Sequence, residues 1–326
     1  MADRAARPRL LFFGTPAFAA EQLEELIARG ATIAGVVSKP DRPQGRSLRL
    51  EPTAVKQVAL RHALPLFQPE KASSPEFLEQ FKALEADLFV VVAYGEIIKS
   101  HLLEMPALGC INLHASLLPL YRGAAPIQRS LIEGASETGV TIIHMAKAMD
   151  AGDMIVSASL PIDPTTTFGE LRLALCELGK PLLWEAISAL TEGRAERTPQ
   201  QHELASYAPK VELEECQLDW DKGATELHNL IRGVNPEPGS WCWVEWRGER
   251  RRLKVWLSRL YETVEEWPPA TFLHYGPKRW VVACGKGAIE LLEVQLEGKK
   301  RMEASAFARG QLAEELRFLP FGSISD

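Results

Sequence analysis

The first half of the chain alternates short apolar runs with helical patterns, and this alternation limits the possible folds more than any other feature. Almost every residue in these runs is apolar, so each strand needs cover on both faces. The predicted strands are residues 9–13 (RLLFF), 32–37 (TIAGVV), 88–93 (LFVVVA), 109–114 and 139–145. Helical segments separate them, which predicts a doubly wound α/β domain with a mostly parallel sheet of the Rossmann type.

The turn after the first strand is typical of the start of a helix. The strand closes on Gly14, and we expect Thr15 to cap the following helix with Pro16 at its first position. A dinucleotide-binding loop would need a GxGxxG pattern at this place, and the segment lacks it. The sequence therefore argues against a nicotinamide-dependent enzyme.

The pattern changes in the second half. After the polar tract at residues 191–206, one helical segment is followed by five short strand-like runs with Gly- and Pro-rich turns between them. The runs are residues 241–246, 253–261, 271–275, 280–284 and 288–296. They predict a small C-terminal β-barrel of the oligonucleotide-binding type. The expected organisation is thus a domain at 1–190, a linker at 191–206 and a barrel domain at 207–326.

Charge leaves nucleic-acid binding open. The chain of 326 residues has a net charge of −6, which argues against a basic coat over the whole surface. Residues 245–259 nevertheless carry six basic side chains against two acidic ones, so one basic patch is expected in the barrel.

The cysteines and the apolar runs indicate the compartment. Five scattered cysteines without a CxxC pair predict neither a disulfide framework nor a zinc site, and they fit a reducing cytoplasm. No apolar run approaches the length of a membrane span, and the N-terminus lacks the apolar core of an export signal. We therefore expect a cytoplasmic protein that does not enter the membrane.

The segment CINLHASLLPLYRGAAP at residues 110–126 places polar side chains where a predicted strand ends. Asn112 and His114 alternate onto one face of that strand, at the edge of the sheet where ligands bind. An amide donates hydrogen bonds and an imidazole exchanges protons near neutral pH, so together they suit acyl transfer through an oxyanion. The alternative is that Asn112 joins loop segments and His114 is a core histidine with a partner.

A second polar stretch, AMDAGDM at residues 148–154, follows another predicted strand. Its Asp150 could orient His114 or accept a proton from an attacking group. A local Asx-turn is the common alternative for an aspartate this close to a glycine, and spacing does not decide between them. A metal site made of His114, His144 and Asp150 has as little support as the dinucleotide loop.

Seven segments together resemble the methionyl-tRNA formyltransferase family. They follow one another in the order FFGTPAFA (12–19), PDRPQGR (40–46), FQPEK (67–71), VVAYGEII (91–98), GCINLHASLLPLYRGAAPIQ (109–128), ETGVTIIHMAKAMDAGDMI (137–155) and LEGKKRM (296–302). The resemblance implies transfer of a formyl group from 10-formyltetrahydrofolate to the α-amine of methionine on initiator tRNA. It implies no metal.

The resemblance also implies the residues of the site. Asn112, His114 and Asp150 occupy the family's three catalytic positions, with Asp150 keeping His114 oriented and charged. The folate site would be lined by Tyr94, Gly95, Ser116, Leu117, Leu118, Pro119, Ala151, Gly152 and Asp153. Arg46 matches the family's tRNA-contacting arginine. Further candidates for tRNA contacts are Arg42, Lys299, Lys300 and Arg301.

Two alternatives remain beside the tRNA enzyme. Another folate-dependent formyltransferase would act on glycinamide ribonucleotide or an amino sugar nucleotide, but the second domain and the PDRPQGR loop favour tRNA. An idle RNA-binding protein would need only the barrel, and the presence of Asn112, His114 and Asp150 together argues against it. The protein is expected to act as a monomer.

Overall fold

The computed structural model describes residues 7–44, 49–309 and 315–322 of the chain, which divides into two compact units. The first unit consists of Met1–Pro126, Glu137–Leu160 and Arg172–Ala208, and the second of Ile127–Ser136, Pro161–Leu171 and Pro209–Asp326. The domain boundaries expected at 190 and 206 stay a prediction. The two units differ from them because residues 127–136 and 161–171 group with the second unit.

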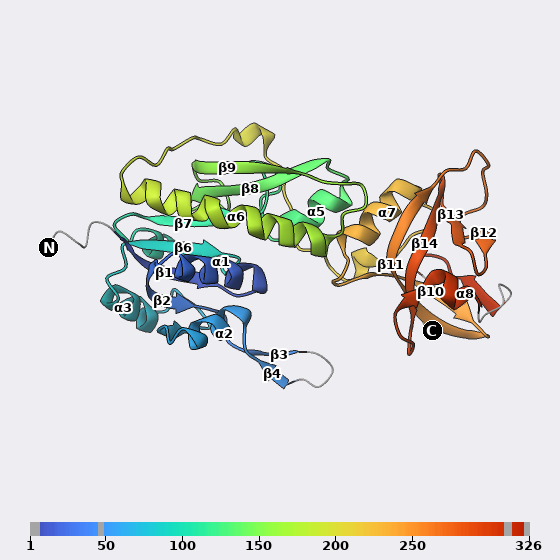
Figure 1. The fold of residues 1–326 in the computed structure, drawn as a ribbon, viewed down its shortest axis with the longest axis horizontal. Coiled ribbons are helices and arrows are strands. Elements are labelled where there is room, and N and C mark those ends of the chain that lie inside the picture. The colour runs from blue at the N-terminus through green and yellow to red at the C-terminus, as the bar shows by residue number, and fades with distance from the viewer. Residues whose placement is uncertain (1–6, 45–48, 310–314, 323–326) are drawn as a thin grey trace. The chain divides into compact units, whose positions relative to one another are not determined.

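The first unit is built on a seven-stranded sheet with the order β5-β2-β1-β6-β7-β8-β9 (Figure 1). Its strands are β1 (Arg9–Gly14), β2 (Thr32–Val37), β5 (Leu66–Phe67), β6 (Leu88–Val92), β7 (Cys110–His114), β8 (Glu137–His144) and β9 (Met154–Pro161). The first five strands of the sheet, β5, β2, β1, β6 and β7, run parallel to one another. Strand β8 is antiparallel to β7. The chain changes direction across the sheet between β1 and β6, which confirms the doubly wound topology and puts the ligand-binding edge at their carboxyl ends.

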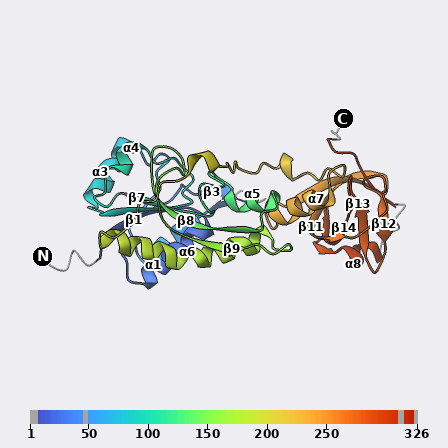
Figure 2. The same cartoon turned by 90° about the horizontal axis from the view of Figure 1, so that it is seen from above.

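Helices cover this sheet on both faces. Its helices are α1 (Ala17–Ala28), α2 (Ala54–Arg61), α3 (Pro75–Ala83), α4 (Ser100–Leu103) and α6 (Phe168–Thr191). Figure 2 shows α3 and α4 on one side of the sheet and α1 and α6 on the other. On the first side, Phe13 and Phe89 of the strands pack against Phe81 of α3 in one apolar cluster. The apolar runs of the sequence are buried because both of their faces are covered in this way.

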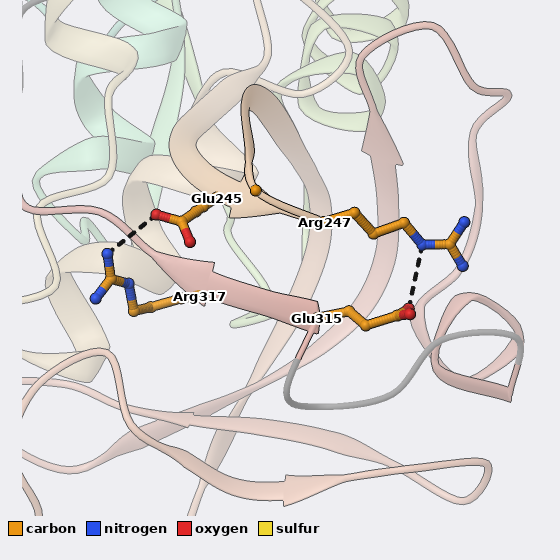
Figure 3. Close-up of a pocket in the computed structure, with 5 residues that line it drawn as sticks. Glu245, Arg247, Glu315 and Arg317 are labelled. Carbon is orange, nitrogen blue, oxygen red and sulfur yellow. Dashed lines mark hydrogen bonds and ion pairs between the residues drawn. The ribbon is translucent and has the colours of Figure 1, made fainter.

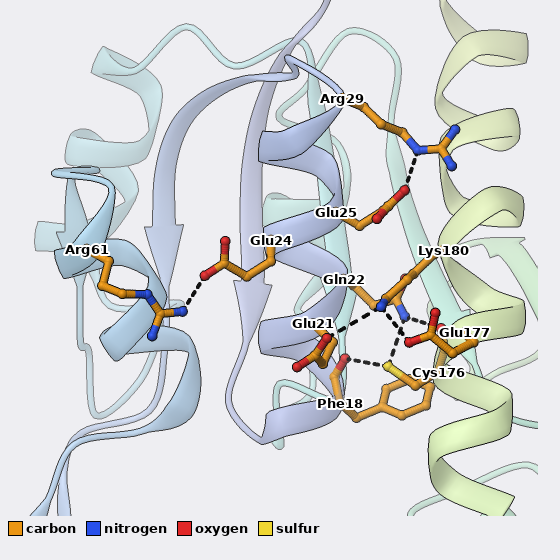
Figure 4. Close-up of polar contacts among 10 residues, drawn as sticks. All are labelled: Phe18, Glu21, Gln22, Glu24, Glu25, Arg29, Arg61, Cys176, Glu177 and Lys180. Carbon is orange, nitrogen blue, oxygen red and sulfur yellow. Dashed lines mark hydrogen bonds and ion pairs between the residues drawn. The ribbon is translucent and has the colours of Figure 1, made fainter.

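Helix α1 lies between α2 and α6, as Figure 4 shows. Its Glu24 forms an ion pair with Arg61 of α2. On the other side, the fully buried Gln22 donates a hydrogen bond through Nε2 to the carbonyl oxygen of Cys176 in α6, at 2.8 Å. These polar contacts fix α1 against both neighbours.

A strand pair and two short helices remain to be described. Strands β3 (Arg42–Gln44) and β4 (Arg49–Glu51) form an antiparallel pair, with residues 45–48 between them outside the described part of the chain. A short 3-10 helix, η1 (His202–Leu204), lies in the tract expected to be a linker. Helix α5 (Pro126–Ile132) continues from the first unit into the second.

The second unit is an antiparallel sheet with the order β12-β13-β14-β11-β10-β16, and β15 pairs with β14. Its elements are η2 (Glu214–Cys216), α7 (Ala224–Gly233), β10 (Ser240–Trp246), β11 (Glu249–Tyr261), β12 (Phe272–Tyr275), β13 (Trp280–Ala283), β14 (Ala288–Leu296), β15 (Met302–Glu303), α8 (Ala304–Arg309) and β16 (Leu316–Phe318). The five predicted strands correspond to β10 to β14. Strands β15 and β16 and helix α8 were not predicted.

The second sheet curls around its own apolar core. The ring of Phe272 in β12 lies 5.2 Å from the ring of Phe318 in β16, so side chains from the two ends of the sheet meet. Between them, the fully buried Trp280 stacks on Phe307 of α8 at 5.6 Å. The result is a half-barrel, as the spacing of the short strands predicted.

Candidate active site at the end of strand β7

The carboxyl ends of β1 and β6 are joined by a side chain. The hydroxyl of Thr15 donates to the carbonyl oxygen of Tyr94 at 2.9 Å, across the point where the strand order reverses. The prediction that Thr15 caps α1 is therefore wrong: Pro16 holds the cap position, and no side chain caps this helix. The hydroxyl fixes the two loops at the sheet edge instead of the helix start.

Asn112 and His114 lie on β7 with one residue between them, and both side chains are buried. The ring nitrogen Nε2 of His114 is 2.8 Å from the carbonyl oxygen of Tyr121. Because a carbonyl oxygen only accepts hydrogen bonds, this contact requires a proton on Nε2. The other ring nitrogen, Nδ1, is then the one that can face a substrate.

The amide of Asn112 forms no hydrogen bond with any of the residues that the structure describes. The residue is 9% exposed, and its amide atoms are not among the fully buried polar atoms that lack a partner, so solvent or a ligand can reach them. The interpretation of Asn112 as a residue that joins loop segments therefore has no contact to support it. The side chain is available to a bound substrate.

Asp150 is brought to His114 by the loop that follows β8. Its Oδ2 oxygen accepts a hydrogen bond from the backbone N–H of Gly123 at 2.8 Å and lies 3.7 Å from Nδ1 of His114. The residue has a φ of +50°, a conformation that costs a non-glycine residue about 1–3 kcal/mol and that clusters at functional sites. Its carboxylate is thus bonded to the loop after β7 rather than to a local Asx-turn.

The loop Ser116–Pro119 is held rigidly at the same edge. The hydroxyl of Ser116 donates to the carbonyl oxygen of Leu120 at 2.6 Å, and Thr141 of β8 donates to the carbonyl oxygen of Ser116 at 2.7 Å. The same threonine oxygen accepts the N–H of Leu118 at 3.1 Å. Leu117 is half-buried against Gly139, where an added Cβ would lie 2.5 Å from its side chain.

Tyr94 and Gly95 follow β6, next to β7 in the sheet. The Tyr94 side chain is 2% exposed and packs on Phe13 at 5.5 Å, so it belongs to the core, and burial raises the pKa of its phenol. Any contact of Tyr94 with a ligand would therefore use its backbone. Gly95 has a φ of +84°, which favours glycine in this turn.

Ala151, Gly152 and Asp153 continue the loop that carries Asp150. A Cβ on Gly152 would lie 1.7 Å from the carbonyl oxygen of His144, so only glycine fits. The Asp153 carboxylate lies 3.8 Å from Arg197. The turn is tight because the backbone at Gly152 approaches the backbone at His144 closely.

His144 does not assemble with His114 and Asp150 into a metal site. Burial lowers the pKa of His144, and Arg197 lowers it further. Over the described ranges, no group of three or more His, Cys, Asp or Glu residues is arranged to hold a metal ion.

Arg122 and Gln200, which the sequence patterns did not single out, lie behind the Asp150 loop. Both side chains are 5% exposed. Gln200 donates through Nε2 to the carbonyl oxygens of Asp150 and Gly152, at 2.8 Å each, and its Oε1 accepts from Arg122. No spacing rule joins these positions, because Gln200 comes from the tract that composition marked as a linker.

The basic candidates among the described residues are exposed. Arg42 is exposed on β3, whereas Arg46 falls outside the described residues. Lys299, Lys300 and Arg301 are exposed between β14 and β15, and Arg301 forms an ion pair of 2.5 Å with Glu293. One residue of the five is thus already neutralised within the fold.

The outer face of β10 and β11 carries a ladder of cations on tryptophan rings, which we call the tryptophan ladder. Its residues are Trp241, Trp243, Arg250, Arg252, Lys254, Trp256 and Arg301. The Arg252 guanidinium lies 4.4 Å from the Trp241 ring and 5.2 Å from the Trp243 ring. No carboxylate in the described part of the chain lies within ion-pair distance of Arg252, and its buried Nε has no hydrogen-bond partner there.

A polar pocket of about 530 Å³ opens elsewhere in the second unit (Figure 3). It is lined by Glu245, Arg247, Gly248, Glu315 and Arg317. Ion pairs join Glu245 to Arg317 at 3.1 Å and Arg247 to Glu315 at 3.2 Å. The pocket contains none of the predicted site residues, and its charges neutralise one another.

No helix among the described residues combines the length and the apolar character needed to cross a bilayer.

Comparison with known families gives two matches along the chain. The family described as "Formyl transferase" matches residues 8–187, and the family described as "Formyl transferase, C-terminal domain" matches residues 210–312. Together the two matches span most of both units.

Similar sequences and structures extend this result. The chain is 52% identical to the methionyl-tRNA formyltransferase of Protochlamydia amoebophila (strain UWE25) over 97% of this chain and 99% of that protein. It is 43% identical to that of Chlamydia pneumoniae, over 95% and 98%. Among solved structures, an N-formyltransferase from Helicobacter canadensis in complex with folinic acid and dTDP-3-aminofucose aligns with a TM-score of 0.66 at 18% identity, over 87% of this chain and 98% of that one. HypX from Aquifex aeolicus in complex with tetrahydrofolic acid aligns with a TM-score of 0.62 at 15% identity, over 92% and 47%. At these identities the two structures establish the fold alone.

Proposed function

Because this chain belongs to the methionyl-tRNA formyltransferase family, we propose that it transfers the formyl group of 10-formyltetrahydrofolate to the α-amine of methionine on initiator methionyl-tRNA. It is a one-carbon transferase that uses a folate-derived formyl donor. The observation that carries the assignment of the site is the approach of Asp150 to His114, on the strand that also presents Asn112.

In the proposed mechanism, the methionyl amine attacks the formyl carbon, and the formyl oxygen becomes an oxyanion. Asn112 donates through its amide to that oxygen, since its side chain has no competing partner in the described structure. His114 donates through Nδ1, because Nε2 is already bonded to Tyr121. The 3.7 Å between Nδ1 and Asp150 exceeds a hydrogen bond, which leaves this nitrogen available.

Asp150 has two roles in this scheme. Its carboxylate, 3.7 Å from Nδ1, lies where it can orient the His114 ring toward the oxyanion. Its carboxylate also accepts the proton that the attacking amine must lose. The intermediate then collapses: the bond from the formyl carbon to folate N10 breaks, N10 regains a proton, and the products are tetrahydrofolate and formylmethionyl-tRNA.

The folate site is proposed at the loops around the same edge. Ser116, Leu117, Leu118 and Pro119 would form one wall, since their backbone is fixed by Thr141. The backbone of Tyr94 and Gly95 and the turn Ala151, Gly152 and Asp153 would form the others. Half-buried Leu117 offers an apolar surface of the kind that binds an aromatic ring system.

The tRNA contacts are proposed at Arg42, Arg46, Lys299, Lys300 and Arg301. Exposure of Arg42, Lys299 and Lys300 supports phosphate contact. The tryptophan ladder adds Arg252, whose guanidinium lies 4.4 Å from the Trp241 ring and 5.2 Å from the Trp243 ring, without a carboxylate of the described residues to neutralise it. Within this proposal the protein acts as a monomer in the cytoplasm, and the five unpaired, buried cysteines fit a reducing compartment.

The decisive experiment offers purified protein 10-formyltetrahydrofolate and charged initiator tRNA, with glycinamide ribonucleotide and an amino sugar nucleotide as competing acceptors. We expect formylmethionyl-tRNA to accumulate and the two competitors to remain unmodified. Formylation of a competitor with the tRNA left untouched would replace the proposed acceptor. A reaction without protein serves as the blank for uncatalysed transfer.

A further inference from the structure

We propose that Arg122 and Gln200 form a buried clamp that positions Asp150 for proton transfer. The inference rests on the proposed function for its kinetic consequences, but the clamp itself is a property of the fold. Both residues act through Asp150 and are positioning residues. They lie in the first unit, together with Asn112, His114 and Asp150.

The clamp is tied to the backbone of the Asp150 turn at two points. One nitrogen, Nε2 of Gln200, donates to the carbonyl oxygens of Asp150 and Gly152, both at 2.8 Å. Asp150 has a positive φ that a non-glycine residue adopts only when its surroundings enforce it. Gln200 enforces it from one side, and the N–H of Gly123 holds the carboxylate on the other.

Arg122 determines which way the Gln200 amide points. Its Nε and Nη2 reach the Oε1 atom of Gln200 at 3.2 and 2.6 Å. A guanidinium has only donors, so the amide must turn its oxygen toward Arg122 and its NH₂ group toward the two carbonyls. The reversed amide would oppose donors to donors and an acceptor to acceptors. The orientation of the donor is therefore fixed.

Arg122 is itself fixed by the segment 198–208, which we call the strap. The N–H of Arg122 donates to the carbonyl oxygen of Ser206 at 2.8 Å, and its carbonyl oxygen accepts from Ala208 at 2.7 Å. Its Nη2 also lies 2.9 Å from Nδ1 of His202. Arg122 is 5% exposed, and its guanidinium has no carboxylate within ion-pair distance among the described residues. A buried charge without an ionic partner is costly, and here its hydrogen bonds serve only the strap and the clamp.

The strap also reaches the partner of His114. The hydroxyl of Ser206 accepts the N–H of Tyr121 at 2.9 Å, and the carbonyl of Tyr121 bonds Nε2 of His114. The strap thus supports both the imidazole and the carboxylate, from two residues that are neighbours in the loop after β7. A shift of this segment would change the distance between the two catalytic groups.

The test uses Gln200→Glu, which keeps the shape of the side chain and an oxygen for Arg122 but replaces the double donor with a second acceptor. We expect kcat to fall about 10- to 100-fold, since displacement of a catalytic group by about 1 Å has effects of this size, with KM for the folate donor unchanged within about twofold. Gln22→Ala is the matched control: it removes another buried glutamine whose amide clamps a carbonyl oxygen in the same unit, far along the chain from Asp150. It should keep the wild-type kcat.

A double-variant cycle separates positioning from general stability. In an Asp150→Asn background, Gln200→Glu should lower kcat by no more than about twofold, because the group that it positions has already lost its function. An equal loss in both backgrounds would overturn the proposal. So would a wild-type kcat for Gln200→Glu alone.

Hydrogen exchange gives a readout that does not depend on the reaction. Amides of residues 144–153 should exchange about tenfold faster in Gln200→Glu than in wild-type protein. In Gln22→Ala, their exchange rates should equal those of the wild type. Unchanged exchange in Gln200→Glu would refute the clamp. If the wild-type protein formylates no acceptor, the proposed function fails, and this exchange comparison still decides whether the clamp exists.

Discussion

Nδ1 of His114 lies 3.7 Å from Oδ2 of Asp150, while the same oxygen is held at 2.8 Å by the backbone N–H of Gly123. The carboxylate is thus anchored by one hydrogen bond and set close to the imidazole without being bonded to it. This separation leaves Nδ1 able to reach a substrate oxygen and Oδ2 able to receive a proton. The proposed formyl transfer uses both capabilities, a donor to the oxyanion and an acceptor for the proton of the amine.

The first prediction concerns Asn112. The Asn112→Ala variant should lower kcat about 10²- to 10³-fold, because it removes one oriented donor to the oxyanion. His114→Ala and Asp150→Asn should lower it by comparable or larger factors. Affinity for methionyl-tRNA, measured by filter binding, should remain close to that of the wild type. Turnover near the wild-type level in all three variants would remove the proposed roles.

The second prediction concerns the backbone beneath the Asp150 turn. Gly152→Ala should reduce the free energy of unfolding by about 1–3 kcal/mol and reduce kcat, because its Cβ would lie 1.7 Å from the carbonyl oxygen of His144. Denaturant titration and steady-state kinetics measure the two effects. Gly276→Ala is the control, since an added Cβ there meets no atom within 4 Å. Equal stability of the two variants would contradict the close approach.

The third prediction concerns the tryptophan ladder. Arg252→Ala should weaken tRNA binding and reduce the slope of log K against log salt concentration by about 0.7 to 0.9, the value of one lost phosphate contact. Arg317→Ala removes the same charge from the same unit, but its guanidinium is paired with Glu245. That control should change the slope less. An Arg252→Ala slope equal to the wild-type slope would show that the ladder does not contact phosphate.

The fourth prediction is a loss of stability toward acid pH. Burial lowers the pKa of His228, whose ring is enclosed between the Ser258 hydroxyl and the Pro164 carbonyl, and burial also lowers the pKa of His144. Each imidazole is more easily protonated in the unfolded chain than in the folded one. Their contribution is therefore complete above the unfolded pKa of about 6.5 and declines as pH falls toward the lower folded values.

Unfolding at pH 7.5 and pH 5.5 measures this effect. The free energy of unfolding of the wild type should be lower at pH 5.5, and His228→Gln should lose less between the two pH values. His101→Gln replaces an exposed histidine and should behave as the wild type does. A pH dependence in His228→Gln equal to that of the wild type would exclude this histidine as a source.

Much of the first unit follows from short-range patterns. The runs RLLFF and LFVVVA can satisfy their apolar side chains only as strands covered on both faces, and they became β1 and β6. The half-barrel followed in the same way from its strand spacing. Strands β15 and β16 escaped prediction because they contain two and three residues, too few for a periodicity to show.

The sequence carries a signal for the tryptophan ladder. Trp241 and Trp243 alternate with the buried Cys242 and Val244, and Arg252 alternates with the buried Leu253. The pairing of Trp243 with Arg252 needs only the register of a β-hairpin. Alternation alone would have placed these side chains on one outer face.

The role of Gln200 had no such signal. Its partners Asp150 and Arg122 are separated from it by 50 and 78 positions along the chain, and a polar tract with few apolar residues has the composition of a linker. Only the folded structure shows that the tract forms hydrogen bonds to the loops before it. Composition indicates whether a segment can fold by itself, and it says nothing of hydrogen bonds to distant residues such as those of Gln200.

The path of the strap sets a limit on how the protein can be shortened. A fragment that ends at residue 190 would contain Asn112, His114 and Asp150 but would lack Gln200, Ser206 and Ala208, and with them the bonds to Arg122, Tyr121 and the Asp150 turn. With the proposed site and clamp, a minimal catalytic fragment would extend at least to Ala208. For the same reason, we expect a protease cut or an engineered insertion within 198–208 to disable the proposed site although it changes none of Asn112, His114 and Asp150.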